Sequence, residues 1–381
     1  MQDTDSHSFS LISEAGIESI YTPTEQDTDE YEFVFDDGES ECLHQDIGSS
    51  CGTSLAPSIF DYEHSHGRRY HAYLGGRYPL PNDKGEQCRE LVEHLLMEQL
   101  LVRFRHSSTI SFSVKVVLID SLAQDGRLFL SDIGDEPQKI IDLGTGKGTW
   151  VEDVADLYPR TSVIGTDLSP IQRTSMPLNA SMFVEDCEDP YWASGHGFDL
   201  VHFRGVAGFL LDLDAMVVNA HKHIRCGGWI EFQEFDYTVL CDDGTMQEDD
   251  PLRAFFDTCA QGVRKYGCTN FGKQDMRKAL RSAGFIQVQM VSKKVPISSW
   301  PRDEAMKDIG TLMEANILEY IGALAAKPLV ALGIPEEERK DMVSRACKSL
   351  KYGKAHRYMN CRFVLGQKDE EGSVVDSGSD L

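Results

Sequence analysis

The first 67 residues contain no Lys or Arg at all, yet they carry 16 Asp and Glu residues. The segment 369–381 adds five more acids, and removing these 21 charges from the net −25 leaves only −4 for residues 68–368. A nucleic-acid track needs clustered Lys and Arg, so we expect no nucleic-acid partner. Acidic, Ser-rich segments of this kind predict solvated, disordered tails over 1–60 and 369–381. An acidic arm that docks on a partner is the alternative for 1–60.

Long apolar runs and paired cysteines are also missing. No run approaches the roughly 20 residues of a membrane span, and the acidic first residues do not resemble a targeting segment. The ten cysteines form no C-x-x-C pair and no Cys/His spacing typical of a metal site. The pair Asp242-Asp243 is best explained as a polar loop. We therefore expect reduced thiols, no membrane contact, no metal centre and a cytoplasmic location.

Hydrophobic residues make up 41% of the 381 residues, enough for one large domain with appendages. Short apolar runs alternate with helical patterns, which predicts a doubly wound α/β fold with a mostly parallel sheet. The expected strands are 139–143, 162–167, 180–184, 198–203, 229–232, 285–295 and 357–366. The expected helices are 150–158, 213–224, 251–265 and 273–283, with a helical insert over about 303–351. The domain proper would span 135–368.

Residues 61–134 should form an arm ahead of this domain. Asn82 or Asp83 would cap a helix that begins near Lys84 and has leucines at helical spacing. The β-rich segment 103–118 then interrupts the pattern and is followed by a short helix over 120–124. An inserted hairpin and an artefact of the gene model explain 103–118 equally well. A short strand over 32–35 is a further prediction.

The turn after the strand 139–143 carries three alternating glycines, Asp142-x-Gly-x-Gly-x-Gly148. Glycine tolerates positive φ and lets a ligand approach the backbone, and the N–H groups at the start of the next helix suit an anion. The alternative is an ordinary strand–helix turn. A dinucleotide fingerprint needs Gly-x-Gly-x-x-Gly, but Thr149 occupies its third glycine position. The spacing instead resembles motif I of class I S-adenosylmethionine (SAM) methyltransferases, although a nicotinamide dehydrogenase remains an alternative.

Further ligand-binding residues are expected where other strands end. Asp167, nineteen residues after the last glycine, is placed to accept from both ribose hydroxyls, or to cap a helix. Asp186 would accept from the adenine amino group beside the backbone N–H of Cys187, although Glu185, Glu188 or Asp189 could take its place. The expected cofactor set is Asp142, Gly144, Thr145, Gly146, Gly148, Asp167, Leu168, Asp186, Cys187 and Arg204.

The methyl acceptor should lie beyond the next two strands. Arg204 would face it, and Glu234 is a candidate base, which is needed only for a protonated acceptor. His202 is assigned to the same side, with a buried structural histidine as the alternative.

Several longer motifs resemble the LaeA-like methyltransferases of filamentous fungi over about residues 66–368. They are Gly67-Arg-Arg-Tyr-His-Ala-Tyr73, Tyr78-Pro-Leu-Pro-Asn-Asp83, Glu185-Asp-Cys-Glu-Asp-Pro190 and Gly227-Gly-Trp-Ile-Glu231. The resemblance implies a Rossmann-like SAM-binding domain whose N-terminal arm folds over the cofactor, with Tyr70 near the SAM pocket. It also implies either an enzyme that methylates a small-molecule hydroxyl, carboxyl or amine in secondary metabolism, or a nuclear regulator that works with velvet-type proteins.

Overall fold

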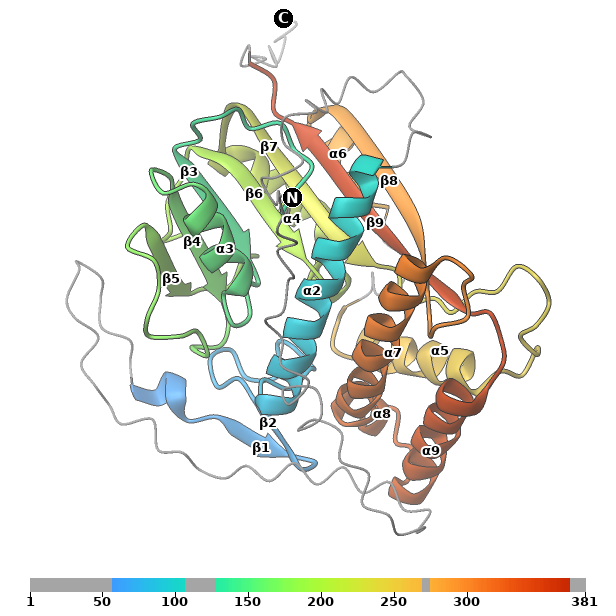
Figure 1. Ribbon diagram of the computed structural model, residues 1–381. Helices are drawn as coiled ribbons and strands as arrows, with labels where there is room; N and C mark the ends of the chain where they lie inside the picture. The colour runs from blue at the N-terminus through green and yellow to red at the C-terminus, as the bar shows by residue number, and fades with distance from the viewer. Residues whose placement is uncertain (1–56, 107–127, 269–274, 371–381) are drawn as a thin grey trace, which may run out of the picture. The chain divides into compact units, whose positions relative to one another are not determined.

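The computed structural model describes residues 57–106, 128–268 and 275–370 (Figure 1). All of them belong to one compact unit, Phe35–Leu381. The predicted strand over 32–35, the helix over 120–124 and residues 107–118 of the β-rich segment lie outside the described residues. Residues 103–106, predicted as part of that β-rich segment, instead continue the helix Lys84–His106.

A seven-stranded sheet, in the order β5-β4-β3-β6-β7-β9-β8, forms the centre of the domain. The strands from β5 to β7 are parallel, whereas β9 runs antiparallel to both β7 and β8. This confirms the predicted fold class. The bounds are β3 (Lys139–Leu143), β4 (Ser162–Asp167), β5 (Ala180–Val184), β6 (Phe198–Arg204), β7 (Ile224–Phe235), β8 (Ile286–Pro296) and β9 (Tyr358–Gln367).

Strand β7 begins at Ile224, five residues before the predicted start. Gly227 has a φ of 76°, and a Cβ on Gly228 would lie 2.7 Å from the carbonyl oxygen of Phe198. The register with β6 shifts between Phe198 and Leu200. The glycine pair is therefore an irregularity inside the strand, where two backbones approach closely, and not a break before it.

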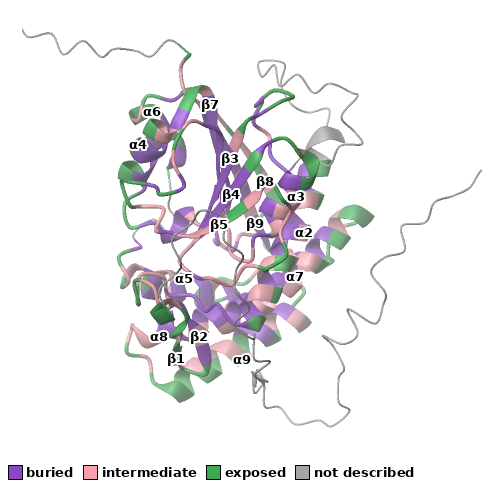
Figure 2. Ribbon diagram, turned by 90° about the vertical axis from the view of Figure 1, so that its left-hand side faces the viewer, coloured by how far each residue is buried: buried purple, intermediate pink, exposed green. Residues whose placement is uncertain are grey.

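Helices cover both faces of the sheet (Figure 1). Alternate residues of β3 point to opposite faces: Ile140 packs with α3 (Thr149–Leu157), whereas Ile141 packs with α4 (Leu213–His223) and α6 (Met276–Ser282). Figure 2 shows the buried strands between these partly exposed helices. Burial on both faces explains the short apolar runs of the inner strands β3 and β4.

A helical layer adjoins the β7–β9 side of the sheet (Figure 1). Its apolar core comes from α2, α5 and the helical insert, and includes Met97, Phe256 and Ile317. The helices are α2 (Lys84–His106), α5 (Pro251–Arg264), α7 (Glu304–Ala325), α8 (Lys327–Val330) and α9 (Glu336–Tyr352). Asp303 caps α7 by accepting from the Met306 N–H. The insert predicted over 303–351 thus consists of α7, α8 and α9.

The arm begins with a hairpin of β1 (Glu63–Ser65) and β2 (Arg68–Tyr70). Its two turn residues, His66 and Gly67, both have positive φ, as a type I′ turn requires. The arm ends where Asp83 Oδ1 accepts from the Glu86 N–H at 3.1 Å, so Asp83 is the predicted cap of α2.

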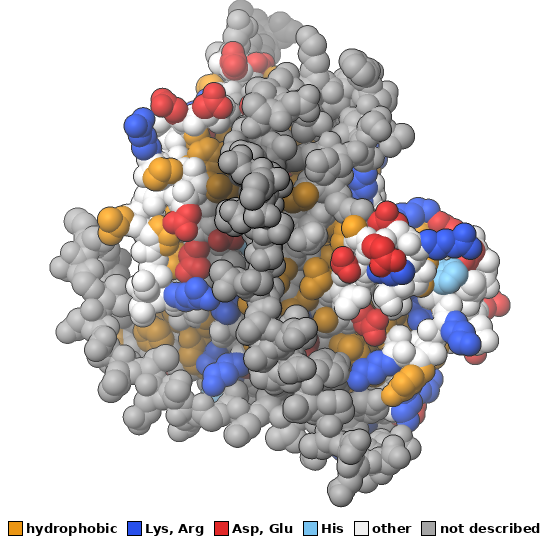
Figure 3. Space-filling view, in the orientation of Figure 1, with side chains coloured by type: hydrophobic (Ala, Val, Ile, Leu, Met, Phe, Trp, Pro, Cys, Tyr) orange, Lys and Arg blue, Asp and Glu red, His pale blue; other side chains and the backbone are white. Residues whose placement is uncertain are grey.

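The described surface carries mixed charge. In Figure 3, Lys and Arg side chains stand among Asp and Glu side chains on the face shown. None of the described helices is both long enough and apolar enough to span a membrane.

Candidate functional site

A cleft opens at the carboxyl ends of β3, β4, β5 and β6, where ligands of open α/β sheets bind. The glycine loop and these strand ends line one side, and α2 and the arm line the other. Of the predicted cofactor residues, all but Gly148 and Tyr70 line this cleft.

The glycine loop, residues 144–148, lies close to neighbouring side chains. Gly144, Gly146 and Gly148 have φ values of 74°, 54° and 83°, and the N–H groups of Gly144 and Thr145 both donate to the Thr166 carbonyl. A Cβ on Gly144 would lie 2.5 Å from the Val206 side chain. Gly144 and Gly146 therefore keep the cleft open.

Gly148 serves the packing behind the loop. It precedes α3 in a left-handed conformation, and a Cβ there would collide with the Met182 side chain on β5. Its role is the close helix–sheet contact and not a wall of the cleft.

Asp167 ends β4 at the bottom of the cleft. Its Oδ2 accepts from the Gly146 N–H at 2.9 Å and its Oδ1 from the Ser169 N–H at 2.8 Å. Burial raises the pKa of Asp167 to about 6. These hydrogen bonds fix the orientation of the carboxylate at the cleft. Leu168 follows it in the cleft wall.

Asp186 and Cys187 follow β5 at the next strand end. Burial raises the pKa of the Asp186 carboxyl and raises the pKa of the Cys187 thiol to about 12, which keeps the thiol protonated. Arg77 of the arm pairs with Asp186 at 3.5 Å and with Glu188. The arm is thus tied electrostatically to this end of the cleft.

The arm crosses the cleft but does not place Tyr70 in it. Tyr70 is fully buried, and the Lys327 ammonium of α8 lies 3.8 Å from the centre of its ring. Its neighbour His71 lines the cleft instead. The Asn82 amide donates to the Ser169 hydroxyl at 3.1 Å, which ties the arm to the loop after β4.

Arg204 faces the cleft at the end of β6, as predicted. Its Nε and Nη2 donate to Gln233 Oε1 at 3.1 and 2.9 Å, and its Nη1 lies 2.9 Å from Nδ1 of His94. The guanidinium is therefore locked in place by β7 and α2.

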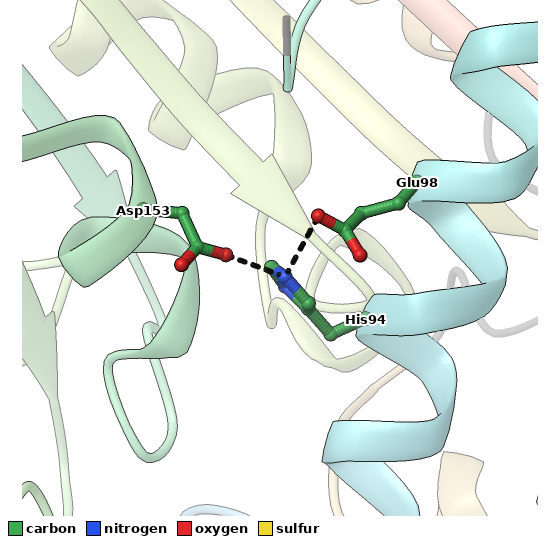
Figure 4. A group of neighbouring side chains, drawn as sticks. All are labelled: His94, Glu98 and Asp153. Carbon is green, nitrogen blue, oxygen red and sulfur yellow. Dashed lines mark ion pairs between the residues drawn. The ribbon is translucent and has the colours of Figure 1, made fainter. Parts of the chain in front are cut away.

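His94 lies within 4 Å of Asp153 and Glu98, a group of the kind that binds metals (Figure 4). Its Nε2 is 2.8 Å from Asp153 and 3.7 Å from Glu98. Because Arg204 only donates, Nδ1 accepts from it, and the ring proton therefore sits on Nε2, facing Asp153. A metal would have to displace that proton beside a guanidinium. The geometry instead suits a structural contact, in which His94 of α2 joins Asp153 of α3 to Arg204 of β6.

The other two predicted acceptor-side residues lie behind the cleft. His202 is fully buried, donates from Nδ1 to Asp142 Oδ1 at 2.7 Å and stacks on Trp150 at 3.9 Å. Glu234 Oε1 accepts from the N–H groups of Val206 and Ala207. Neither side chain lines the cleft. His202 holds Asp142, and Glu234 shapes the loop after β6.

Sequence reasoning missed the cleft residues of α2. Glu90 and Glu93 line the cleft, and a Cβ on Gly205 would lie 3.2 Å from Glu93 Oε1. Arg89 pairs with Glu93 and with Glu86, at 2.7 Å for the latter. The signal was present, because the acids at positions 86, 90 and 93 follow helical spacing and so lie on one side of the helix.

The site fits an adenosyl amino acid on its own geometry. Gly144 and Gly146 place no side chain where a ligand would lie. The carboxyls of Asp167 and Asp186 lie at the carboxyl ends of the adjacent strands β4 and β5. Two polar atoms of the cleft, Thr145 Oγ1 and Glu90 Oε2, are buried without a hydrogen-bond partner among the described residues. Such atoms are what a bound ligand satisfies.

Comparison with known proteins identifies the family of the chain. A family model described as "Methyltransferase domain" matches residues 118–289. Methyltransferase pytC of Aspergillus terreus is 34% identical over 74% of this chain and 79% of its own. Secondary metabolism regulator LAE1 of Cochliobolus heterostrophus is 30% identical over 80% of this chain and 94% of that protein. A phosphoethanolamine N-methyltransferase of Haemonchus contortus, solved with S-adenosylhomocysteine, has a TM-score of 0.38 and 18% identity over 62% of this chain and 50% of that one.

The chain therefore belongs to the LaeA-like methyltransferases of fungi, and its methyl donor is SAM. The resemblance stated from the motifs is confirmed.

Proposed function

We propose that this protein methylates a hydroxyl, carboxyl or amine of a small molecule in fungal secondary metabolism. Its similarity to methyltransferase pytC, over 79% of that protein, supports an enzyme of this type. The observation that carries the proposal is the cleft itself, in which the glycine loop, Asp167 and Asp186 converge beneath an arm. A cytoplasmic location belongs to this proposal.

The cofactor would be held by residues of the cleft. Asp167 would accept from the ribose hydroxyls, Asp186 and Cys187 would face the adenine, and the loop 144–146 would take the methionyl part. When bound, SAM supplies an electrophilic methyl group. The arm and α2 would exclude water, while Arg204, fixed by Gln233 and His94, would position the acceptor. Methyl transfer is an in-line displacement, so alignment and desolvation carry most of the catalysis.

Binding and turnover test this proposal separately. Calorimetry of the full chain should show binding of SAM and S-adenosylhomocysteine but not of NADH. Incubation with methyl-labelled SAM and metabolite extract should transfer the label to a small molecule. Binding of NADH without either adenosyl ligand would refute the cofactor assignment.

A second function is supported by similarity to the regulator LAE1 over 94% of its length. In this version the chain binds SAM in the nucleus and works mainly by docking to a velvet-type protein. Affinity purification from the native host distinguishes the two. A stable velvet-type complex, together with no label transfer to any metabolite fraction, would favour the regulator over the enzyme.

A further inference from the structure

Glu90 of α2 reaches across the cleft to the glycine loop. A Cβ built on Gly146 would lie 2.6 Å from Glu90 Oε2, so only glycine lets this carboxylate come so close to the loop. Both residues line the cleft. The side chain is half-buried as a whole, but Oε2 is shielded from solvent and has no hydrogen-bond partner among the described residues.

The described cations nearby leave Glu90 Oε2 without a hydrogen-bond partner. Arg89, the adjacent cation of α2, pairs with Glu86 and Glu93, one on each side of Glu90 along the helix. Lys147 lines the same cleft but no hydrogen bond joins it to Glu90 Oε2. A shielded, unpartnered carboxylate oxygen is costly. A positively charged ligand group in the cleft would remove that cost.

We propose that Glu90 binds the α-ammonium group of SAM, an inference that rests on the proposed function. The cation of the methionyl part is the group that complements a lone carboxylate above the glycine loop. Asp167 already occupies the strand-end position suited to ribose hydroxyls. A charge-assisted hydrogen bond of this kind adds affinity and fixes the orientation of the methionyl part.

The surrounding charges make this contact depend on pH. Burial first, and then the carboxyls of Glu86, Asp167 and Glu93, raise the pKa of Glu90 to about 8, against the opposing effect of Arg89. At neutral pH, Glu90 is therefore mostly protonated in the protein without ligand. Binding of an ammonium group favours the ionised form, so the proton leaves as the ligand enters.

The test is calorimetric titration of the full chain at pH 7.5 with SAM, S-adenosylhomocysteine and methylthioadenosine, which lacks the amino-acid part. E90Q should bind both amino-acid ligands about tenfold or more weakly, the effect of one hydrogen bond to a charged group, and methylthioadenosine unchanged. E337Q makes the same change at an exposed position of α9, outside the cleft lining, and should match wild type. E90D, which keeps the charge, should fall between.

Proton release gives a second readout. Repeating the S-adenosylhomocysteine titration in buffers of different ionisation enthalpy should show proton release for wild type and less for E90Q. Equal affinity of E90Q and wild type for SAM would overturn the proposal. An equal loss for methylthioadenosine would also overturn it, because Glu90 would then contact the nucleoside. Failure of wild type to bind any of the three would instead refute the proposed function.

Discussion

Arg68 and Asp83 form a buried two-point ion pair that closes the arm on itself. Arg68 Nε lies 2.5 Å from Asp83 Oδ2, and Nη2 lies 2.9 Å from Oδ1. The same carboxylate caps α2 through the Glu86 N–H. One side chain thus joins the hairpin to the start of the helix that carries the cleft residues.

Asp83→Ala should destabilise the fold by about 3–5 kcal/mol, because it removes the two-point carboxylate partner of the buried Arg68 guanidinium. Urea unfolding at pH 7 measures this. Glu336→Gln, which removes an exposed partner of Lys340, should change little. Burial raises the pKa of Asp83, but Arg68 outweighs it and holds the pKa below its usual value. The stability that the pair contributes is therefore present at neutral pH and lost as pH falls through that lowered pKa.

Asp167→Ala should weaken SAM binding by about 1.5–3 kcal/mol, roughly 10- to 150-fold, the range for hydrogen bonds to a charged group. Because burial raises its pKa to about 6, wild-type affinity should fall as pH drops through 6. The variant should lose this contribution and keep only the weaker pH dependence that comes from Glu90. Calorimetry from pH 5.5 to 7.5 measures both effects. An unchanged dissociation constant would remove Asp167 from the cofactor site.

Gly144→Ala should weaken both folding and SAM binding. The residue has a φ of 74°, and an alanine in this left-handed conformation is strained by roughly 1–2 kcal/mol. Its Cβ would also collide with the Val206 side chain, which adds a second cost. Gly333→Ala is the matched control, because Gly333 has a φ of 75° with open space around it. Thermal unfolding of the two variants separates strain from collision. Val206→Ala added to Gly144→Ala should recover only the collision part.

Glu234→Gln should flatten the pH dependence of stability. Burial raises the pKa of Glu234 to about 8, although the N–H groups of Ala207 and Val206 oppose this. An unfolded glutamate ionises near 4.5, so wild-type stability should decline as pH rises from about 4.5 to 8, and then level off. The variant should be close to wild type at pH 5 and relatively more stable at pH 8. Denaturant unfolding at the two pH values measures the difference.

His202→Gln should act on folding and not on the chemical step. It removes the imidazole that donates to Asp142 and stacks on Trp150, at a cost of about 1–3 kcal/mol for a buried acceptor left unsatisfied. Turnover per folded molecule should stay near wild type, once SAM is saturating. If kcat falls far more than the amount of folded protein, His202 takes part in the reaction of the methyl acceptor after all.

The parallel strands were predictable because each is a short apolar run bounded by a turn signal. The predicted spans of β3, β4 and β5 match the structure residue for residue. For β3 and β4 the reason is that buried strands leave a strong local apolar pattern. Strand β7 was predicted too short, because Gly227-Gly228 resembles punctuation but sits inside the strand. Whether a glycine pair breaks or bends a strand depends on the neighbouring backbone.

Some residues of the cleft were predictable from the sequence and others were not. Asp167 and Asp186 were placed from the sequence because the carboxyl ends of parallel strands meet at one edge of the sheet. Glu90 was missed, because its place in the cleft depends on how α2 crosses the glycine loop 56 residues further along the chain.

The sequence by itself determined the fold class, the family and the strand-end carboxyls, because these depend on patterns within a few residues. Only the tertiary structure decided that Tyr70 packs on Lys327, that His202 holds Asp142, and that Glu90 faces Gly146. The physical reason is that burial, pairing and pKa are properties of neighbours in space, and these neighbours come from elements far apart in the chain.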